Sequence, residues 1–326
     1  MAKVTINDVA ALAGVSKKTV SHVVNGIGRV APATRARVEA AVAELGFVPS
    51  PQARAFASGR SSLVVLVHDG SDDPPLAALL AGLEEGLASA GLVAGVHTGG
   101  DAGALARLIA AQRPRAVVLA PPLSADPALA LACAEADCAM IRLAPEPMGG
   151  LFVWTDERQA AADAAGWLVA LGHRRIGFIA GPEDDRRARA RELGFIDAMA
   201  EQGLERGAEI VAQGEFTLAS GEDAARLLLE VSPRPTAILA ANDAMAAGAL
   251  RALHAAGLAV PGDISVMGLG DAPLAAVLAP PLATMALPWR DLARLAAGRI
   301  IDPAAPTPSA LPGRLVPRAS VGPAGD

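Results

Sequence analysis

The sequence predicts a small all-α head joined to a larger α/β body with parallel sheets. The first 46 residues contain three short helical patterns separated by glycine-containing turns. From residue 62 onward, apolar runs of four or five residues alternate with helical segments over about 250 residues. Such alternation is typical of a parallel-sheet architecture.

Local signals set the bounds of the first two helices of the head. Thr5 and Asp8 have the spacing of a capping box and open the first helix, and Gly14 breaks it in a tight turn. Ser16 is the expected N-cap of the second helix, and Asn25-Gly26 ends it. Two short helices joined by a glycine turn form a helix-turn-helix.

The third helix begins at Pro32 and stops at Gly46. Ala31 stands at its N-cap position, where its methyl side chain provides no acceptor, which weakens the cap by about 1 kcal/mol. Residues 47–60 then combine two prolines with a short Ala/Arg-rich stretch. Because an isolated helix this short is marginal in water, we expect a linker that becomes helical only when something holds it.

In the body, the apolar runs indicate buried strands, and the segments between them indicate helices. The expected strands are Leu63–Val67, Leu92–Val96, Ala116–Ala120, Ala139–Leu143, Ile176–Ala180, Ala237–Ala240 and Ile264–Met267, with a last one near Leu315. The expected helices include residues 75–89, 157–171, 186–202, 221–230 and 243–256.

Charge is distributed unevenly along the chain. Residues 1–60 carry eight basic and three acidic side chains, a net charge of +5, whereas the remaining residues carry 20 basic and 31 acidic ones, a net charge of −11. A basic head on an acidic body suggests that the head alone contacts a polyanion. Chance scatter of surface charge is the alternative.

A helix-turn-helix places the N-terminal side chains of its second helix against base edges in the major groove of DNA. The residues expected there are Ser16, Lys17, Lys18, Thr19, Ser21 and His22. Lysine donates to guanine or to phosphate. Short polar side chains suited to phosphate contacts are Thr5, Ser16, Thr19, Asn25 and Thr34. The alternative is that Lys17 and Lys18 merely form a solvated helix face.

Longer motifs make the chain resemble the LacI/GalR family of bacterial transcription regulators. The head matches through VTINDVAALAGVSKKTVSHVVNG and RVAPATRARVEAAVAELGFVPSPQARAFASG, and the body through LGHRRIGFIAGP, RELGF, AANDAMAAGAL and PGDISVMGLGD. The resemblance implies a DNA-binding headpiece at 1–47, a hinge segment at 48–61 and a two-lobed core like that of periplasmic sugar-binding proteins at 62–326. It places lobe 1 at about 62–153 plus 285–318 and lobe 2 at about 156–284.

The resemblance also implies a homodimer on pseudo-palindromic double-stranded operator DNA. In the family a leucine of the hinge wedges into the minor groove, and Phe56 stands at that position here. Ala53 and Arg54 lie on the same hinge element and are expected against the groove or its phosphates. A linker residue packed on the body is the alternative for Phe56.

Ligands of two-lobed α/β proteins bind between the lobes, beyond the carboxyl ends of strands. Asn242 follows such a strand, so it either contacts the ligand or caps the next helix, and the resemblance favours ligand contact. The resemblance implies that Arg191, Phe216 and Trp289 face the effector. Alternatively, Arg191 is a surface cation and the two aromatic residues pack in the core. Asp69 follows the first body strand and either reaches the cleft or is solvated in its loop.

The body departs from the family pattern after the strand Ile264–Met267. The family usually places an acidic residue, which accepts bonds from sugar hydroxyls, at the position of Gly270, and often a glutamine at that of Leu287. Either Asp271 takes over the acidic role, or the pocket takes a less hydroxylated ligand, or sensing is lost.

Other classes of protein lack support in the sequence. The two cysteines, Cys133 and Cys138, have no second pair with which to bind a metal, and no cofactor is expected. No nucleophile-elbow, metalloprotease or Walker motif indicates an enzyme. A membrane span at Ala272–Trp289 would contain four prolines, and residues 1–13 lack the apolar stretch of an export signal, which a transport-type binding protein needs.

The sequence therefore predicts a cytoplasmic, nucleoid-associated transcription regulator, with repression as the expected mode. Its operator affinity is expected to respond to a small, sugar-like effector. A regulator of the same architecture that has no small-molecule effector is the alternative.

Overall fold

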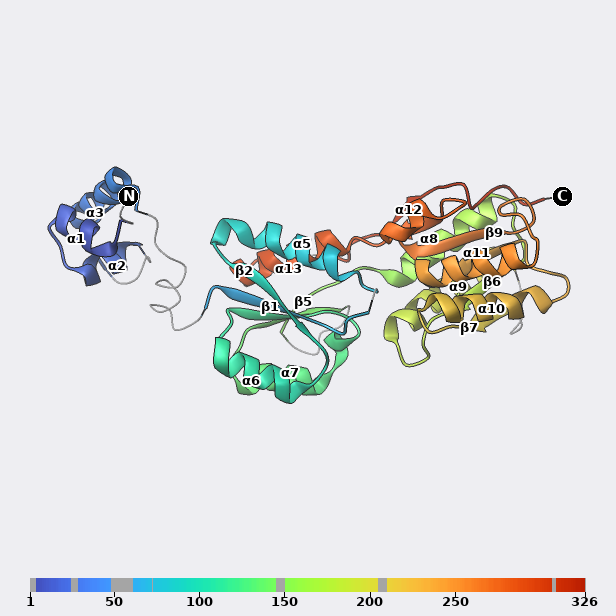
Figure 1. The fold of residues 1–326 in the computed structure, drawn as a ribbon, viewed down its shortest axis with the longest axis horizontal. Helices are drawn as coiled ribbons and strands as arrows, with labels where there is room; N and C mark the ends of the chain where they lie inside the picture. The colour runs from blue at the N-terminus through green and yellow to red at the C-terminus, as the bar shows by residue number, and fades with distance from the viewer. Residues whose placement is uncertain are drawn as a thin grey trace.

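The computed structural model describes residues 4–24, 29–47, 61–71, 73–144, 150–204, 210–306 and 309–325. The head contains the three expected helices, α1 (Ile6–Ala13), α2 (Lys17–Val24) and α3 (Pro32–Leu45) (Figure 1). Each contributes a fully buried valine, Val9, Val20 and Val38, to a small core of their own. The head therefore has its own apolar centre, separate from the core clusters of the body.

The first lobe is built on a five-stranded parallel sheet with the order β2-β1-β3-β4-β5. Its strands are β1 (Leu63–His68), β2 (Val93–Thr98), β3 (Ala116–Leu119), β4 (Met140–Leu143) and β5 (Leu151–Val153). The flanking helices are α5 (Leu76–Leu87), η1 (Ala88–Ala90), α6 (Ala102–Gln112), η2 (Leu123–Ala125), α7 (Pro127–Glu135) and α13 (Trp289–Ile301). Figure 1 shows α5 and α13 on one face of this sheet and α6 and α7 on the other.

The second lobe is built on a six-stranded sheet with the order β11-β10-β9-β8-β6-β7, in which only β11 runs antiparallel to its neighbour. Its strands are β6 (Ile176–Ala180), β7 (Val211–Gln213), β8 (Ala237–Ala240), β9 (Ser265–Gly270), β10 (Ala283–Ala286) and β11 (Arg314–Val316). Its helices are α8 (Glu157–Ala170), α9 (Arg186–Glu201), α10 (Leu218–Glu230), α11 (Asp243–Ala255) and α12 (Pro273–Val277).

All seven expected body strands are present, together with β11 near Leu315. Sequence patterns gave no signal for β5, β7 and β10. Strands β5 and β7 have three residues each and lie at sheet edges. The sequence of β10, Ala-Thr-Met-Ala, is rich in alanine, which has little preference for strands.

The expected assignment of residues 285–318 to lobe 1 needs correction. Strand β11 pairs with β10 and therefore belongs to the second sheet. Among the helices and strands described in this segment, α13 is the one that packs in lobe 1, mainly against α5. The two helices approach so closely that a Cβ atom at Gly82 would lie 2.0 Å from the Arg290 carbonyl oxygen, so this position of α5 requires glycine.

Candidate functional site

The helix-turn-helix depends on small residues where α1 meets α2. Gly14 ends α1 with a φ of 63°, a left-handed conformation that glycine adopts without strain. Ala10 and Ala13 of α1 are buried, as is Val20 of α2. These side chains let α2 begin three residues after the turn and fix its direction relative to α1.

The N-terminal turn of α2 faces solvent. Ser16 Oγ accepts a hydrogen bond from the Thr19 backbone N–H over 3.1 Å, so Ser16 is the N-cap, as expected. The exposed residues of this turn are Ser16, Lys17 and Lys18, and the half-buried ones are Thr19, Ser21 and His22. A solvent-facing first turn with two lysines is suited to contact base edges and phosphates.

The other residues expected to contact DNA have different surroundings. The Thr5 hydroxyl donates to Asp8 Oδ2 over 2.7 Å, and the Thr5 backbone N–H donates to the same oxygen over 2.8 Å. These bonds hold the pKa of Asp8 below its usual range, the backbone bond contributing most. Thr34 is half-buried in the first turn of α3. The remaining expected contacts lie outside the described residues: Asn25, Ala53, Arg54 and Phe56.

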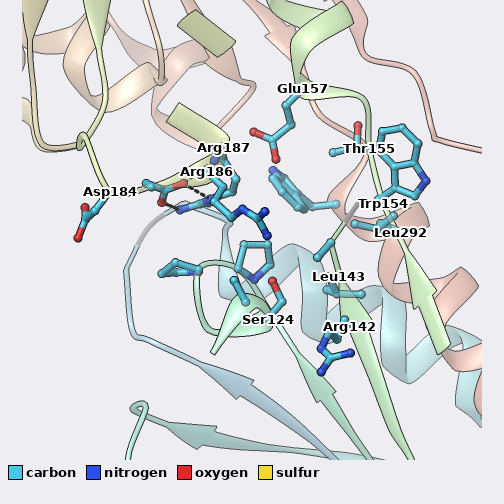
Figure 2. A pocket seen from close by; sticks show the side chains of 16 residues that line it. Ser124, Arg142, Leu143, Trp154, Thr155, Glu157, Asp184, Arg186, Arg187 and Leu292 are labelled. Atoms are coloured by element: carbon cyan, nitrogen blue, oxygen red, sulfur yellow. Dashed lines mark hydrogen bonds and ion pairs between the residues drawn. The ribbon is translucent and has the colours of Figure 1, made fainter. Parts of the chain in front are cut away.

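In the body, a cavity of about 230 Å³ lies between the lobes, and we call it the interlobe cavity. Lobe 1 contributes Pro121, Pro122, Ser124, Ala125, Arg142, Leu143, Ala144, Trp289 and Leu292, the connection between the lobes contributes Trp154 and Thr155, and lobe 2 contributes Glu157, Asp184, Asp185, Arg186 and Arg187. Figure 2 shows Glu157 and Arg187 on one side and Leu143 and Leu292 on the other. A largely apolar cavity with a few charged groups is typical of small-molecule sites.

Trp289 is the sequence-predicted effector residue that lines this cavity. Its side chain is almost completely buried, and among the described residues its indole Nε1 atom is buried without a hydrogen-bond partner. A buried donor without a partner is costly, since it loses its bond to water. A ligand acceptor would remove that cost.

Asp69 and Phe216 lie together at a neighbouring, more open cavity of about 760 Å³. The two cavities share Pro122, Asp184, Asp185 and Arg187 as lining residues. Asp69 Oδ1 accepts bonds from Ser71 N and Ser71 Oγ over 3.0 and 2.7 Å, so the loop partly satisfies this carboxylate. Phe216 has a φ of 56°, an uncommon backbone conformation for an aromatic residue.

Arg191 is completely buried and its guanidinium is fully engaged by the protein. Its Nε donates to Glu157 Oε2 over 2.6 Å, and its Nη1 donates to Asp73 Oδ2 over 2.7 Å and to the Ala241 carbonyl oxygen over 2.5 Å. Phe216 lies beneath, with its ring centroid 5.4 Å from Cζ of Arg191. Asp73 and Glu157 therefore occupy guanidinium donors of Arg191 that were expected to face a ligand.

Arg191 is part of a buried charge cluster that also contains Asp73, Glu157, Asp185 and Arg187. Burial raises the pKa of Glu157, and the charges of Arg191 and Arg187 oppose that rise. Burial also opposes ionisation of Asp73, but the charges of Arg191 and Arg187 outweigh it and hold the pKa of Asp73 below its usual range. Of these two carboxylates, Asp73 is therefore the one held more strongly in its charged form.

Asn242 has the helix-capping role that the sequence left open. Its Oδ1 accepts a bond from the Met245 backbone N–H over 2.8 Å, and its Nδ2 donates to the Phe216 carbonyl oxygen over 2.9 Å. Asn242 thus caps α11 and fixes the loop that carries Phe216. It contributes to the site by positioning that ring.

Asp271 lies away from the interlobe cavity. Its carboxylate accepts a bond from Arg318 Nη2 over 2.7 Å. Asp271 lines a different groove, beside chain segments that connect the two lobes. Gly270 has a φ of 132°, and a Cβ atom there would lie 3.3 Å from Asp243 Oδ2. Asp243 is itself buried, and burial raises its pKa to about 6 although it accepts bonds from Thr284 and Ala272. An acidic residue at position 270 would place a second carboxylate beside Asp243.

Several residues of the site were not among those predicted from the sequence. Arg142 interrupts a buried apolar strand, and a charge in such a strand is a signal that could have drawn attention to it. Asp73 and Glu157 gave no such signal, because loop and helix-start carboxylates are common on protein surfaces. Their buried partners are distant in the sequence: Arg191 bonds both carboxylates, and for Asp73 it does so across the lobes.

Two other kinds of site have no support in the described part of the chain. There, no three or more His, Cys, Asp and Glu side chains gather in a way that could hold a metal ion. Across the same residues, every helix is too short or too polar to span a membrane.

Comparisons with known proteins agree with this architecture. Residues 5–50 match the family model of bacterial regulatory proteins of the lacI family, and residues 165–321 match that of the periplasmic binding protein-like domain. The transcriptional regulator CelR of Thermobifida fusca is 34% identical over 313 residues, which cover 91% of this chain and 92% of CelR. The ribose operon repressor of Escherichia coli K12 is 34% identical over 307 residues, which cover 90% of each chain.

Solved structures show the same likeness over the whole chain. The Lac repressor dimer bound to operator and the anti-inducer ONPF matches with a TM-score of 0.73 at 30% identity, covering 98% of this chain and 100% of that one. The CelR–cellobiose complex matches with a TM-score of 0.71 at 33% identity and the same coverage. The chain belongs to the LacI family of bacterial transcriptional regulators.

Proposed function

We propose that the protein binds operator DNA through the first turn of α2, and that a small molecule in the interlobe cavity alters its affinity for that DNA. The observation that carries this proposal is the interlobe cavity, which takes its lining from both lobes. A ligand that contacts both lobes favours one arrangement of them over another. Coupling of this kind typically amounts to about 1–3 kcal/mol.

The cavity favours a ligand that is compact and partly apolar. Its volume of about 230 Å³ is below the range of about 300–1,000 Å³ found for drug-sized ligands. Prolines and tryptophans provide flat apolar walls, while Glu157 and Trp289 provide an acceptor and a donor. A single-ring sugar or a molecule like it meets these requirements, and cellobiose, which the solved CelR complex contains, is a larger comparison ligand for the test.

DNA binding is proposed to require two copies of the chain. A helix-turn-helix dimer contacts two half-sites about one helical turn apart, so a homodimer matches a pseudo-palindromic operator. We further propose that the protein acts as a repressor in the cytoplasm, where bacterial DNA lies, and that it has no catalytic activity.

The test combines DNA binding with ligand screening. The full-length protein should select a pseudo-palindromic sequence from a random duplex pool, and a monosaccharide panel should contain a compound that changes its affinity for that sequence. A ligand that raises the melting temperature but leaves DNA affinity unchanged would contradict the coupling. Selection of no sequence would contradict the DNA-binding assignment.

A regulator with no small-molecule effector is the second candidate. Leu287 is buried, Gly270 provides no carboxylate, and the guanidinium of Arg191 is engaged by the chain itself. A thermal-shift screen separates the two candidates, because a specific ligand raises the melting temperature in proportion to RT ln(1 + [L]/Kd).

A further inference from the structure

The buried charge cluster joins the two lobes through a single residue of lobe 1. Asp73 follows β1 of lobe 1, whereas Glu157, Asp185, Arg187 and Arg191 all belong to lobe 2. The Asp73 carboxylate accepts from Arg191 Nη1 over 2.7 Å and lies 3.5 Å from Arg187 Nη1. The Asp73 carbonyl oxygen also accepts from Arg187 Nη1, over 2.8 Å.

The two arginines are held in place without help from Asp73. Arg187 donates to both carboxylate oxygens of Asp185, over 3.1 and 2.6 Å, and Arg191 donates to Glu157 and to the Ala241 carbonyl oxygen. Lobe opening would therefore leave both guanidiniums in position. It would remove only the bonds to Asp73.

Asp73 is also fixed on its own lobe. The His68 ring accepts at Nδ1 from the Gly70 backbone N–H over 2.9 Å, and its Nε2 lies 2.9 Å from the carbonyl oxygen of Pro74, the residue after Asp73. Ser71 Oγ, which donates to Asp69, lies 3.1 Å from the Asp73 carbonyl oxygen. The loop thus presents the carboxylate to lobe 2 with little freedom to turn away.

We propose that Asp73 is an interlobe latch, an internal anion that holds the lobes closed through Arg187 and Arg191 in the absence of ligand. A carboxylate between two guanidiniums forms strong, charge-assisted hydrogen bonds, and burial protects these from screening by salt. The alternative is that apolar packing across the interface closes the lobes, with the ion pairs adding nothing.

The latch affects which effectors the interlobe cavity can bind, and this part of the inference rests on the proposed function. A ligand small enough for the 230 Å³ cavity binds to lobes that the chain already holds together. A ligand that fits only between more widely separated lobes has to separate Asp73 from the two arginines. Removing the Asp73 charge should therefore favour larger ligands over smaller ones.

The experiment uses the full chain without DNA or ligand, in a Trp167→Phe background. Its remaining tryptophans, Trp154 and Trp289, both line the interlobe cavity, so acrylamide quenching of their fluorescence reports on lobe opening. Asp73→Asn should increase the quenching constant by about twofold or more, because the open form becomes populated. The matched control is Asp197→Asn, which removes a 2.6 Å ion pair with Arg158 inside lobe 2 and should leave quenching unchanged.

Equal quenching of Asp73→Asn and the parent would overturn the latch and favour closure by packing. A second variant keeps the charge: Asp73→Glu should have a quenching constant closer to that of the parent than to that of Asp73→Asn, because its carboxylate can still pair with the two arginines. A quenching constant for Asp73→Glu as high as that for Asp73→Asn would also overturn the latch, because the latch depends on the charge. Neither outcome depends on DNA binding or on an effector, so the latch and the proposed function fail separately.

Discussion

The head and the body use their cations in opposite ways. Lys17 and Lys18 on α2 are exposed at the surface of a helix whose first turn contains no acidic residue. Arg187 and Arg191 in the body are buried, and carboxylates surround them. The difference indicates that the lysines are free to meet an external polyanion, whereas the arginines first serve to hold the body together.

The largest expected effect follows from removing the exposed lysines. The double substitution Lys17→Ala/Lys18→Ala should abolish preference for the selected duplex, since each base contact of this kind provides about 1–3 kcal/mol of discrimination. Competition anisotropy against random DNA measures it. Arg226→Ala/Arg251→Ala, on the exposed faces of α10 and α11, is the control. Retained preference with an intact dimer would show that α2 is not the reading helix.

The substitution Arg191→Ala tests the role of the buried arginines in the body. Because the substitution leaves Asp73 and Glu157 buried without their main partner, it should lower the free energy of unfolding of the body by about 3–5 kcal/mol. Urea unfolding monitored by tryptophan fluorescence gives this value. A loss comparable to that of exposed Arg158→Ala would mean that the cluster contributes little to stability.

The buried carboxylate of Asp243 should make stability depend on pH. Its folded-state pKa of about 6 lies above the ordinary aspartate value of 3.8, so the folded state binds the proton more tightly, and this stabilisation is fully present below pH 3.8. This stability should disappear as pH rises through about 6, a change of roughly 3 kcal/mol at most. Asp243→Asn should flatten that part of the pH profile of urea unfolding. An unchanged slope between pH 4 and 6 would contradict the shifted pKa.

The smallest expected effect concerns the N-cap of α3. Ala31 makes no side-chain capping bond, so Ala31→Ser should slow amide exchange in α3 by an amount equivalent to about 1 kcal/mol. Ala36→Ser, one turn into the same helix and exposed, should give no such gain. Equal behaviour of the two variants would indicate that α3 is stabilised by packing alone.

Sequence patterns predicted the head and most of the body strands because both depend on local signals. Ser16 caps α2, and Gly14 adopts the left-handed turn, as their residue types indicate. Local sequence signals could not predict how the residues of the body site pair with one another. One of the buried partners of Arg191 is Asp73, which is 118 residues away in sequence and belongs to the other lobe. Likewise, nothing local to β11 shows that it returns to the second sheet after α13 has crossed to the first.

The most direct test of the account measures DNA affinity in the presence and absence of a ligand of the interlobe cavity. Anisotropy titrations with the selected duplex should show the dissociation constant changing by about 5-fold or more when a compound that raises the melting temperature is present. Trp289→Phe should reduce that change, because it removes the unpartnered indole donor at the cavity wall. A dissociation constant that stays the same with the cavity occupied would contradict the claim that this cavity controls DNA binding.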